Sequence, residues 1–324
     1  MNIGRRGALG AMGMLAMPGL AQAQAAFPDQ PIRMIVPFAA GGPADIIARV
    51  VARAMSERLG KPIVVEARAG AGGLIGVDVA SKSRPDGHTL VMASSGAIVI
   101  IPHMRSNMPY DPLRDLTPVT QVLAVPQIVS VAPNLAVRNL AELVAMAKAK
   151  PGELTFGSAG IGSSLHMAGE LLKLRAGIDI THIPYGGAAP AVTDLLAGRI
   201  QILAADVPAL IGQVRAGALR ALAVTAQERL AILPDVPTAI EAGVPNMISE
   251  TWYGLFGPAA IPQDRVDILV NAARASLQDA EVRRVLGEQG GRIVGSTPAE
   301  FNTFIRETNA TWGDVVRTTG ARLE

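Results

Sequence analysis

Short apolar runs alternate with longer amphipathic stretches along most of the chain. An apolar run at 32–38 is followed by a helical pattern at 43–59 and a second apolar run at 63–66. A short helical pattern at 73–82 and another apolar run at 89–93 come next. Strands that alternate with helices in this way predict a parallel, doubly wound sheet.

The same alternation resumes after an irregular stretch. Residues 101–118 are rich in Pro and Asp, and 119–131 has the pattern of a strand. Helical and strand patterns then alternate as far as residue 225, a strand is predicted at 252–256, and the C-terminal part is helical. We therefore predict an α/β fold with two doubly wound α/β domains and a ligand cleft between them.

Two glycine-rich turns each lead from a strand pattern into a helical pattern. Gly41 and Gly42 precede the helix at 43–59, and Gly186 and Gly187 precede one at 188–197. A helix start carries unpaired N–H groups and a partial positive charge, and glycine lets a ligand come close to them. Two such ends predict an anionic small molecule held from two sides without a basic side chain. The alternative is ordinary tight packing at both turns.

The residues around these turns are the candidates for ligand contact. We expect Asp45 to orient the first turn and Tyr185 to form a wall of the pocket. A third turn, at 158–164, offers three hydroxyls, of which Ser163 or Ser164 is expected to cap the helix. Trp252 and Tyr253 could line the cleft or belong to the core. The expected ligand-binding residues are Phe38, Ala40, Gly41, Gly42, Asp45, Ser95, Ser158, Gly160, Ser163, Ser164, Tyr185, Gly187, Ala188, Asp206 and Trp252.

The composition and the missing motifs exclude several kinds of site. The chain has 324 residues, 49% of them hydrophobic, which is typical of an ordered protein long enough for two domains. It has no cysteine, so it can form neither a disulfide nor a thiolate metal site. The nucleophile-elbow, P-loop and zinc-protease motifs are missing, and the glycines at 70–76 only nearly match a dinucleotide fingerprint. We expect no catalytic residue, no metal and no cofactor.

The first 25 residues have the pattern of an export signal. Arg5 and Arg6 precede an apolar stretch at 7–20 that is short for a membrane span, and small-residue cleavage sites follow, near Ala23–Ala26. We favour the general secretory route, with twin-arginine export and a retained membrane anchor as alternatives. Removing the two arginines of the signal leaves 27 of the 29 basic residues, equal to the 27 acidic ones. The mature charge therefore gives no sign of nucleic-acid binding.

Several motifs of the chain resemble those of one receptor family, the substrate-binding proteins of tripartite tricarboxylate transporters, also called Bug-type extracytoplasmic solute receptors. The similarity spans essentially the whole mature chain. It is carried by Pro31–Asp45, Val65–Gly73, Pro85-Asp86-Gly87, Tyr110-Asp111-Pro112, Gly157–Gly160, His182–Tyr185, Leu222–Thr225 and Leu233–Thr238.

The resemblance implies a fold like that of type II periplasmic binding proteins, which close around their ligand. One domain would comprise residues 26–124 and 249–324, and the other residues 125–248. Backbone N–H groups of the two glycine-rich loops, with ordered waters, would hold a small organic carboxylate. The resemblance also implies a monomer in the periplasm that delivers its ligand to the permease subunits of a membrane transporter.

Three positions depart from the family pattern. Ala44 stands where the family often has a hydroxyl residue, and Gly186 where it often has a basic one. Ala204-Ala205-Asp206 is similar to a family segment that carries Asp-Asn, but Val207 stands in place of the Asn. These differences leave the contacts to the far end of the ligand, and so the identity of the carboxylate, open. Two other functions also remain: a ligand-binding partner of a membrane signalling receptor, and an enzyme that acts on a carboxylate.

Overall fold

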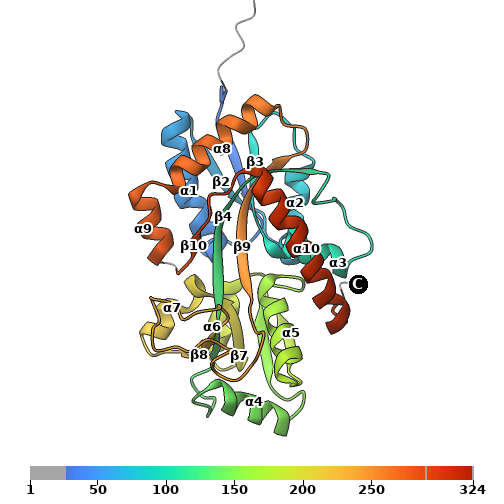
Figure 1. Cartoon of the computed structure of the whole chain (residues 1–324), viewed down its shortest axis with the longest axis vertical. Coiled ribbons are helices and arrows are strands. Elements are labelled where there is room, and N and C mark those ends of the chain that lie inside the picture. The colour runs from blue at the N-terminus through green and yellow to red at the C-terminus, as the bar shows by residue number, and fades with distance from the viewer. Residues whose placement is uncertain (1–26, 289, 323–324) are drawn as a thin grey trace, which may run out of the picture.

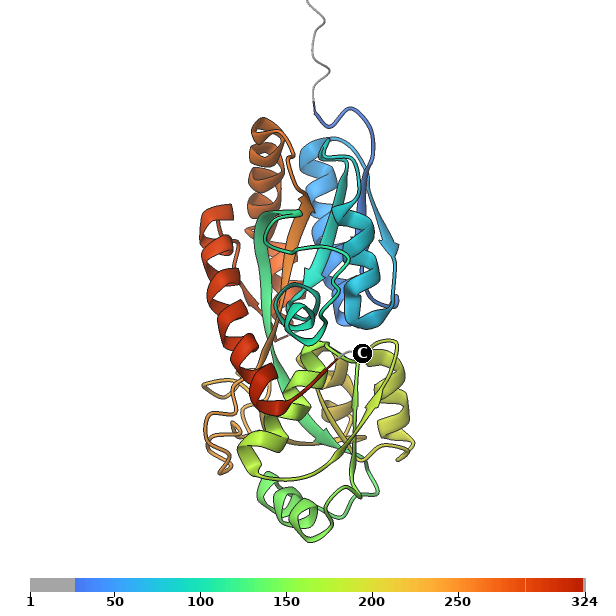
Figure 2. The ribbon, with the colours of Figure 1, turned by 90° about the vertical axis from the view of Figure 1, so that its right-hand side faces the viewer.

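The computed structural model describes residues 27–288 and 290–322, so the predicted export signal at 1–25 lies outside the described residues. The chain forms two α/β lobes stacked along the long axis of the molecule (Figures 1 and 2). We call the lobe that holds residue 27 the first domain and the other lobe the second domain. None of the helices within 27–288 and 290–322 is both long and apolar enough to cross a membrane.

Parallel strands form the centre of the first domain. The strand β1 pairs in parallel with both β2 and β3, as the alternating pattern predicts. The helix α1 begins after Gly42 with Pro43 as its first residue, where the missing N–H of proline costs no helical hydrogen bond. The elements are β1 (Ile32–Val36), α1 (Pro43–Leu59), β2 (Ile63–Ala67), η1 (Ala71–Gly73), α2 (Leu74–Ser81), β3 (Thr89–Ser94), η2 (Gly96–Ile100), α3 (Ile101–Met104), α8 (Gln263–Leu277), α9 (Ala280–Glu288), β10 (Arg292–Ile293) and α10 (Pro298–Thr319).

The second domain repeats this plan, again around a set of parallel strands. The strand β5 pairs in parallel with β6 and β7. The helix α7 follows β7 directly and has no counterpart in the sequence prediction, since Gly212 weakens the helical pattern of its nine residues. The elements are α4 (Leu140–Ala149), β5 (Thr155–Ser158), α5 (Ser164–Ala176), β6 (Thr181–Pro184), α6 (Ala188–Leu196), β7 (Ile202–Asp206), α7 (Val207–Arg215) and β8 (Arg220–Val224).

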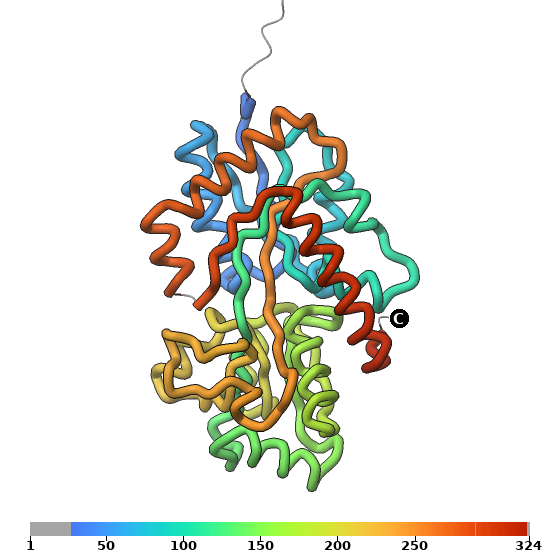
Figure 3. Tube along the Cα trace, viewed as in Figure 1, coloured from blue at the N-terminus to red at the C-terminus, as the bar shows by residue number. Residues whose placement is uncertain are grey.

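Two long antiparallel strands connect the domains. Figure 3 shows β4 (Leu116–Val131) and β9 (Glu250–Pro258) side by side from one lobe to the other. The sheet order β2-β1-β3-β9-β4-β7-β5-β6 passes from the first domain into the second through this pair. The α/β fold with two doubly wound domains is thereby confirmed, with an antiparallel pair at its centre. The domain limits at 124/125 and 248/249 stay a prediction.

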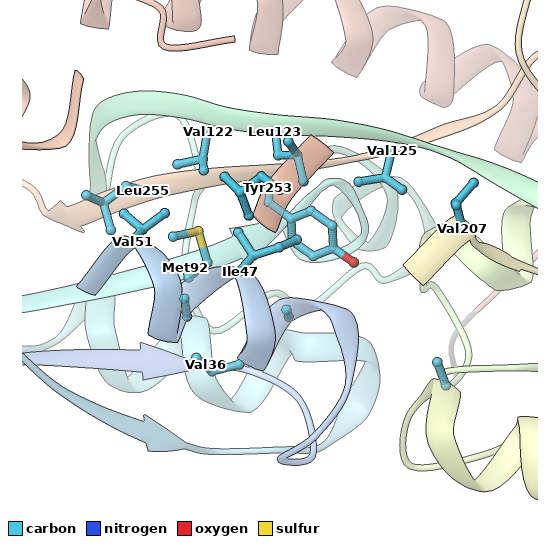
Figure 4. Packing of buried hydrophobic residues seen from close by; sticks show 14 of the residues in the cluster. Val36, Ile47, Val51, Met92, Val122, Leu123, Val125, Val207, Tyr253 and Leu255 are labelled. Carbon is cyan, nitrogen blue, oxygen red and sulfur yellow. The ribbon is translucent and has the colours of Figure 1, made fainter. Parts of the chain in front are cut away.

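The largest hydrophobic cluster of the described residues extends from the first domain into the second, where it includes residues of α6, α7 and β8. Figure 4 shows Val36, Ile47 and Met92 packed near the strands β4 and β9. Burying a large aliphatic side chain contributes roughly 1.5–3 kcal/mol, so this packing fixes the strands that carry the site. Tyr253 belongs to the same cluster, and its hydroxyl points toward Val207 at the start of α7 (Figure 4).

Candidate functional site

A cleft between the two domains contains about 460 Å³ of space free of protein atoms, part of it open to solvent. Its walls come from the turn before α1, the starts of α5 and α6, and the strands β3 and β9. Among the described residues, no lysine, arginine or histidine lines it, and Asp206 is the one charged residue of the lining. The lining residues are Phe38, Ala39, Gly42, Pro43, Ala44, Ser94, Ala159, Ser163, Ser164, Leu165, Gly187, Ala188, Ala189, Asp206, Thr251 and Tyr253.

The starts of three helices line this cleft. Ala44 belongs to the first turn of α1, Ser164 and Leu165 begin α5, and Ala188 and Ala189 begin α6. The backbone N–H groups in the first turn of a helix have no acceptor within that helix, and they carry the positive end of its dipole. The cleft can therefore bind a negatively charged group without a cationic side chain.

The turn before α1 is held by a buried carboxylate. Asp45 is 4% exposed, and its Oδ2 accepts hydrogen bonds from Gly41 N at 3.0 Å and Arg49 Nε at 2.9 Å. Burial would raise the pKa of Asp45, but these two donors outweigh it, so the pKa lies below its usual value. Asp45 thus fixes the turn and does not line the cleft. The N–H of Gly41 is already used inside the turn, where a φ of +80° suits glycine.

The turn before α6 is fixed from outside the cleft. The hydroxyl of Tyr185 donates to Asp194 at 2.8 Å, and Arg199 binds the other carboxylate oxygen of Asp194 at 2.7 Å. Burial and the bond to Asp194 raise the pKa of Tyr185 to about 12. Tyr185 and Gly160 line a second groove beside the cleft, which the cleft residue Phe38 also borders.

Adjacent serines have different roles at the start of α5. The Oγ of Ser163 accepts from His166 N at 3.2 Å and caps the helix, and its hydroxyl donates to Gly160 O at 2.7 Å. Ser164 lines the cleft, with its Oγ 2.7 Å from Thr251 Oγ1. The cap expected from the sequence is therefore Ser163, which leaves Ser164 oriented toward the cleft.

Two stacked imidazoles support the turn at 158–164, before α5. His166 and His182 have ring centroids 4.0 Å apart, and His182 Nε2 lies 2.6 Å from the Oγ of the fully buried Ser158. Burial, followed by the charges of neighbouring groups, lowers the pKa of His166 to about 3 and that of His182 to about 4. Both rings are therefore neutral at pH 7. Ser158 also accepts from Gly160 N at 3.1 Å, so the cluster fixes the turn.

A buried polar network lies where the cleft meets the connecting strands. The carboxylate of Asp206, only 2% exposed, accepts hydrogen bonds from the hydroxyls of Thr251 and Tyr253 on β9. Gln127 Nε2 on β4 donates to Thr251 Oγ1 at 3.1 Å. Burial raises the pKa of Asp206 to about 6, although its hydrogen bonds act in the opposite direction. This network connects the second domain to the strands that lead into the first.

The structure brings some of the candidate residues together and separates others. Gly41 and Asp45 are hydrogen-bonded to each other within the turn before α1, and Ser158 is hydrogen-bonded to Gly160 within the turn before α5. Ala40 is exposed and does not line the cleft, and the buried Ser95 has no hydrogen-bond partner for its hydroxyl among the described residues. The candidates that line the cleft are Phe38, Gly42, Ser163, Ser164, Gly187, Ala188 and Asp206.

Strand alternation sorts the candidate residues of β3 and β9 between the cleft and the core. Thr251 and Tyr253 line the cleft, whereas Trp252 between them turns to the opposite face and packs edge-on against Phe301, with ring centroids 5.5 Å apart. Ser94, the register partner of Tyr253, lines the cleft in place of Ser95. No described residue forms a hydrogen bond with the Ser94 hydroxyl. A strict period of two along β3 and β9 is the signal that could have identified these residues.

Within residues 27–288 and 290–322, no group of three or more His, Asp or Glu side chains is placed to hold a metal ion.

The family model of the tripartite tricarboxylate transporter family receptor matches residues 47–321. Protein BugT of Bordetella pertussis is 40% identical over 299 residues, which cover 92% of this chain and 92% of that protein.

Two solved structures are similar to this chain over most of its length. An R. palustris protein with adipate is 33% identical, with a TM-score of 0.88 over 92% of this chain and 100% of that one. MatC from Rhodopseudomonas palustris with bound malate is 30% identical, with a TM-score of 0.86 over 90% of this chain and 100% of that one. The chain therefore belongs to the tripartite tricarboxylate transporter family of receptors, the Bug-type periplasmic solute-binding proteins.

Proposed function

We propose that this receptor captures a small organic carboxylate in the cleft between its domains and delivers it to the permease subunits of a tripartite transporter. The observation that carries the proposal is the meeting of three helix starts in a cleft that no cationic side chain lines. Such a site favours an anion over a neutral solute. The relatives solved with adipate and with malate support a carboxylate as the ligand.

The starts of α5 and α6 would provide most of the hydrogen bonds to the carboxylate. Ser164, Leu165, Ala188 and Ala189 line the cleft, and their amides have no acceptor within their helices. Ser94 adds a hydroxyl from the first domain. Ordered waters would complete the contacts, because the turn before α1 already uses the N–H of Gly41 on Asp45.

Ligand capture would close the two domains around the connecting strands β4 and β9. The domains touch through backbone atoms beside the cleft: a Cβ added to Gly96 would lie 2.9 Å from Gly162 O, and one added to Gly72 would lie 2.6 Å from Ile161 O. So close an approach fits a closed conformation, which a hinge motion would open. We place the boundaries of the moving domains at 124/125 and 248/249.

A role in catalysis is not part of the proposal. The nearest arrangement to a nucleophile and its base is Ser158 with His182, and Ser158 is fully buried beneath the third turn. Its hydroxyl is held by Gly160 and cannot reach a ligand in the cleft. We expect a monomeric receptor that is exported to the periplasm and cleaved near Ala23–Ala26, with no cofactor.

A thermal-shift screen of the mature protein against small carboxylates and their neutral amides tests this function. A ligand present at about a hundred times its dissociation constant stabilises a protein by roughly 2.7 kcal/mol. We expect at least one acid to raise the melting temperature and its amide to leave it unchanged. A shift produced only by neutral or cationic solutes would refute the proposal.

A further inference from the structure

Asp206 places a carboxylate in a cleft that we propose to hold an anion, so this inference rests on the proposed function. Its side chain is 2% exposed, and no cationic residue lines the same cleft. A buried ionised carboxylate is unfavourable unless other groups compensate for the loss of water. A neutral residue at this position would avoid that cost and the repulsion of an anionic ligand. The carboxylate therefore requires a functional explanation.

The position of Asp206 at the start of a helix does not explain why a carboxylate is found there. Asp206 directly precedes α7, where an aspartate commonly caps the helix, but its side chain accepts no hydrogen bond from the N–H groups of α7. Asn139 and Ser163 occupy the same position before α4 and α5, and both cap their helices. Asp206 turns away from its helix toward the cleft, where Thr251 and Tyr253 donate to it.

The carboxylate of Asp206 retains capacity for a further donor. An ionised carboxylate offers about four acceptor positions and no donor. The hydroxyls of Thr251 and Tyr253 fill one position on each oxygen, and even with Gln127 close by at least one position remains. With a pKa of about 6, the group is mostly ionised at pH 7. It can therefore receive an O–H or N–H group of a ligand but repels a second carboxylate.

We propose that Asp206 determines ligand specificity by accepting a hydrogen bond from a hydroxyl or amino group carried by the bound carboxylate. The carboxylate of the ligand would lie on the helix starts at Ser164 and Ala188, and its hydroxyl or amino group would lie against Asp206. An unsubstituted acid would leave the buried acceptor without this partner. The preferred ligands are therefore hydroxy- or amino-carboxylates. A hydrogen bond to a charged group predicts a preference of about tenfold or more.

Calorimetric titration of the mature protein at pH 7.5 with matched acids tests this inference. Succinate, malate and aspartate share a four-carbon skeleton and differ by a hydrogen, a hydroxyl or an amino group. Glutarate, 2-hydroxyglutarate and glutamate form the five-carbon series. We expect a substituted acid to bind at least tenfold more tightly than its unsubstituted parent. The substituent of the acid that binds most tightly shows whether Asp206 prefers a hydroxyl or an amino group.

The variant Asp206→Asn should reduce this preference to about threefold or less, mainly by weakening the binding of the substituted acid. Asp206→Ser serves as a second variant if the first fails to fold. Asp179→Asn is the control, because Asp179 is an exposed carboxylate of the second domain that lies outside the cleft lining. This control should retain the full preference of the unmodified protein.

Three results would overturn the inference. The first is equal binding of substituted and unsubstituted acids by the unmodified protein. The second is a preference that survives in Asp206→Asn, and the third is an equal loss of affinity for both kinds of acid in a folded variant, which would assign Asp206 a purely structural role. In each case carboxylates still bind to the unmodified protein and the proposed function stands. Binding of no carboxylate at all would refute the proposed function itself.

Discussion

The two walls of the cleft begin with similar turns but present different chemistry. On the first wall, Pro43 is the first residue of α1 and lacks an N–H, and Asp45 binds the N–H of Gly41. On the second wall, the proline of α6 is the third residue, Pro190, so the amides of Ala188 and Ala189 remain available. A glycine pair thus makes a helix start accessible, but the next residues decide how many donors it offers.

The walls also differ in their polar side chains. The turn and strand of the first wall contribute the hydroxyl of Ser94, and the second wall contributes Ser163, Ser164 and Asp206. The connecting strand β9 adds Thr251 and Tyr253, whose hydroxyls donate to Asp206. Two stacked imidazoles, the buried His166 and the half-buried His182, support the second wall from behind. We infer that the first wall mainly encloses the ligand and that the second recognises its functional groups. The predictions below test this difference.

The largest expected effect is a loss of stability in acid that originates behind the second wall. The pKa values of His166 and His182 are lowered to about 3 and 4, against 6.5 for an ordinary histidine. The unfolded chain therefore binds more protons than the folded chain below pH 6.5, and stability falls as the pH decreases. Between pH 6.5 and 5 the loss is about 2 kcal/mol for each imidazole.

Asp206 acts in the opposite direction over part of this range. Its pKa is about 6 in the folded protein and 3.8 as an ordinary value, so its contribution to stability is full below 3.8 and is lost as the pH rises through 6. The two histidines outweigh one carboxyl, so the net stability should fall. Denaturant unfolding at pH 7.5, 6.5 and 5 measures it. Equal or greater stability at pH 5 would contradict the predicted burial of the neutral rings.

The next effect concerns the contact between the walls. In Gly96→Ala, the new methyl group would meet Gly162 O at 2.9 Å and Ser163 Cα at 3.2 Å, both in the second domain. Because these atoms belong to the backbone, they cannot move aside without opening the cleft. We expect the affinity for the carboxylate found in the screen to fall at least tenfold, which is about 1.4 kcal/mol, with no loss of stability.

Gly212→Ala provides the control for this substitution. Gly212 lies in α7, and a Cβ added there would have no atom within 4 Å. Alanine in a helix is more stable than glycine by roughly 0.5–1 kcal/mol, so this variant should be slightly more stable and bind normally. Calorimetry of both variants decides the point: if Gly96→Ala binds as tightly as Gly212→Ala, the observed approach of the domains is not needed for binding.

The smallest effect separates two neighbouring serines of the second wall. Ser163→Ala removes the cap of α5 and should lower the free energy of unfolding by about 1 kcal/mol. Ser164→Ala keeps the cap and should mainly weaken ligand binding, because its hydroxyl lines the cleft beside Thr251. Chemical denaturation and calorimetry of the two variants measure the separation. A stability loss larger in Ser164→Ala than in Ser163→Ala would reverse these assignments.

Local signals made much of the fold predictable. The helix expected at 43–59 is found at Pro43–Leu59, because Gly42 and Pro43 define its start and Gly60 its end. The capping box of Thr297 and Glu300 likewise defines the start of α10. These signals depend on residues that are close in sequence, and an analysis of a single chain can identify them.

The polar network of the site depends on distant residues, and the sequence did not reveal it. Gln127, Ser164, Asp206 and Thr251 come from β4, α5, the end of β7 and β9, and only the sheet order brings them together. Asp206 was identified through its place in the family, but its partners were not. A strand pattern tells which residues share a face, whereas the pairing of strands decides which faces meet.

The most direct test of carboxylate capture by helix starts is a crystal structure of the mature protein with an acid that raises its melting temperature. We predict that the carboxylate lies in the cleft between the domains, with its oxygens 2.7–3.2 Å from backbone N–H groups at the starts of α5 and α6 or from waters bound to them. We also predict that no lysine, arginine or histidine contacts it. A carboxylate held by a cationic side chain, or bound outside the cleft, would contradict this mechanism.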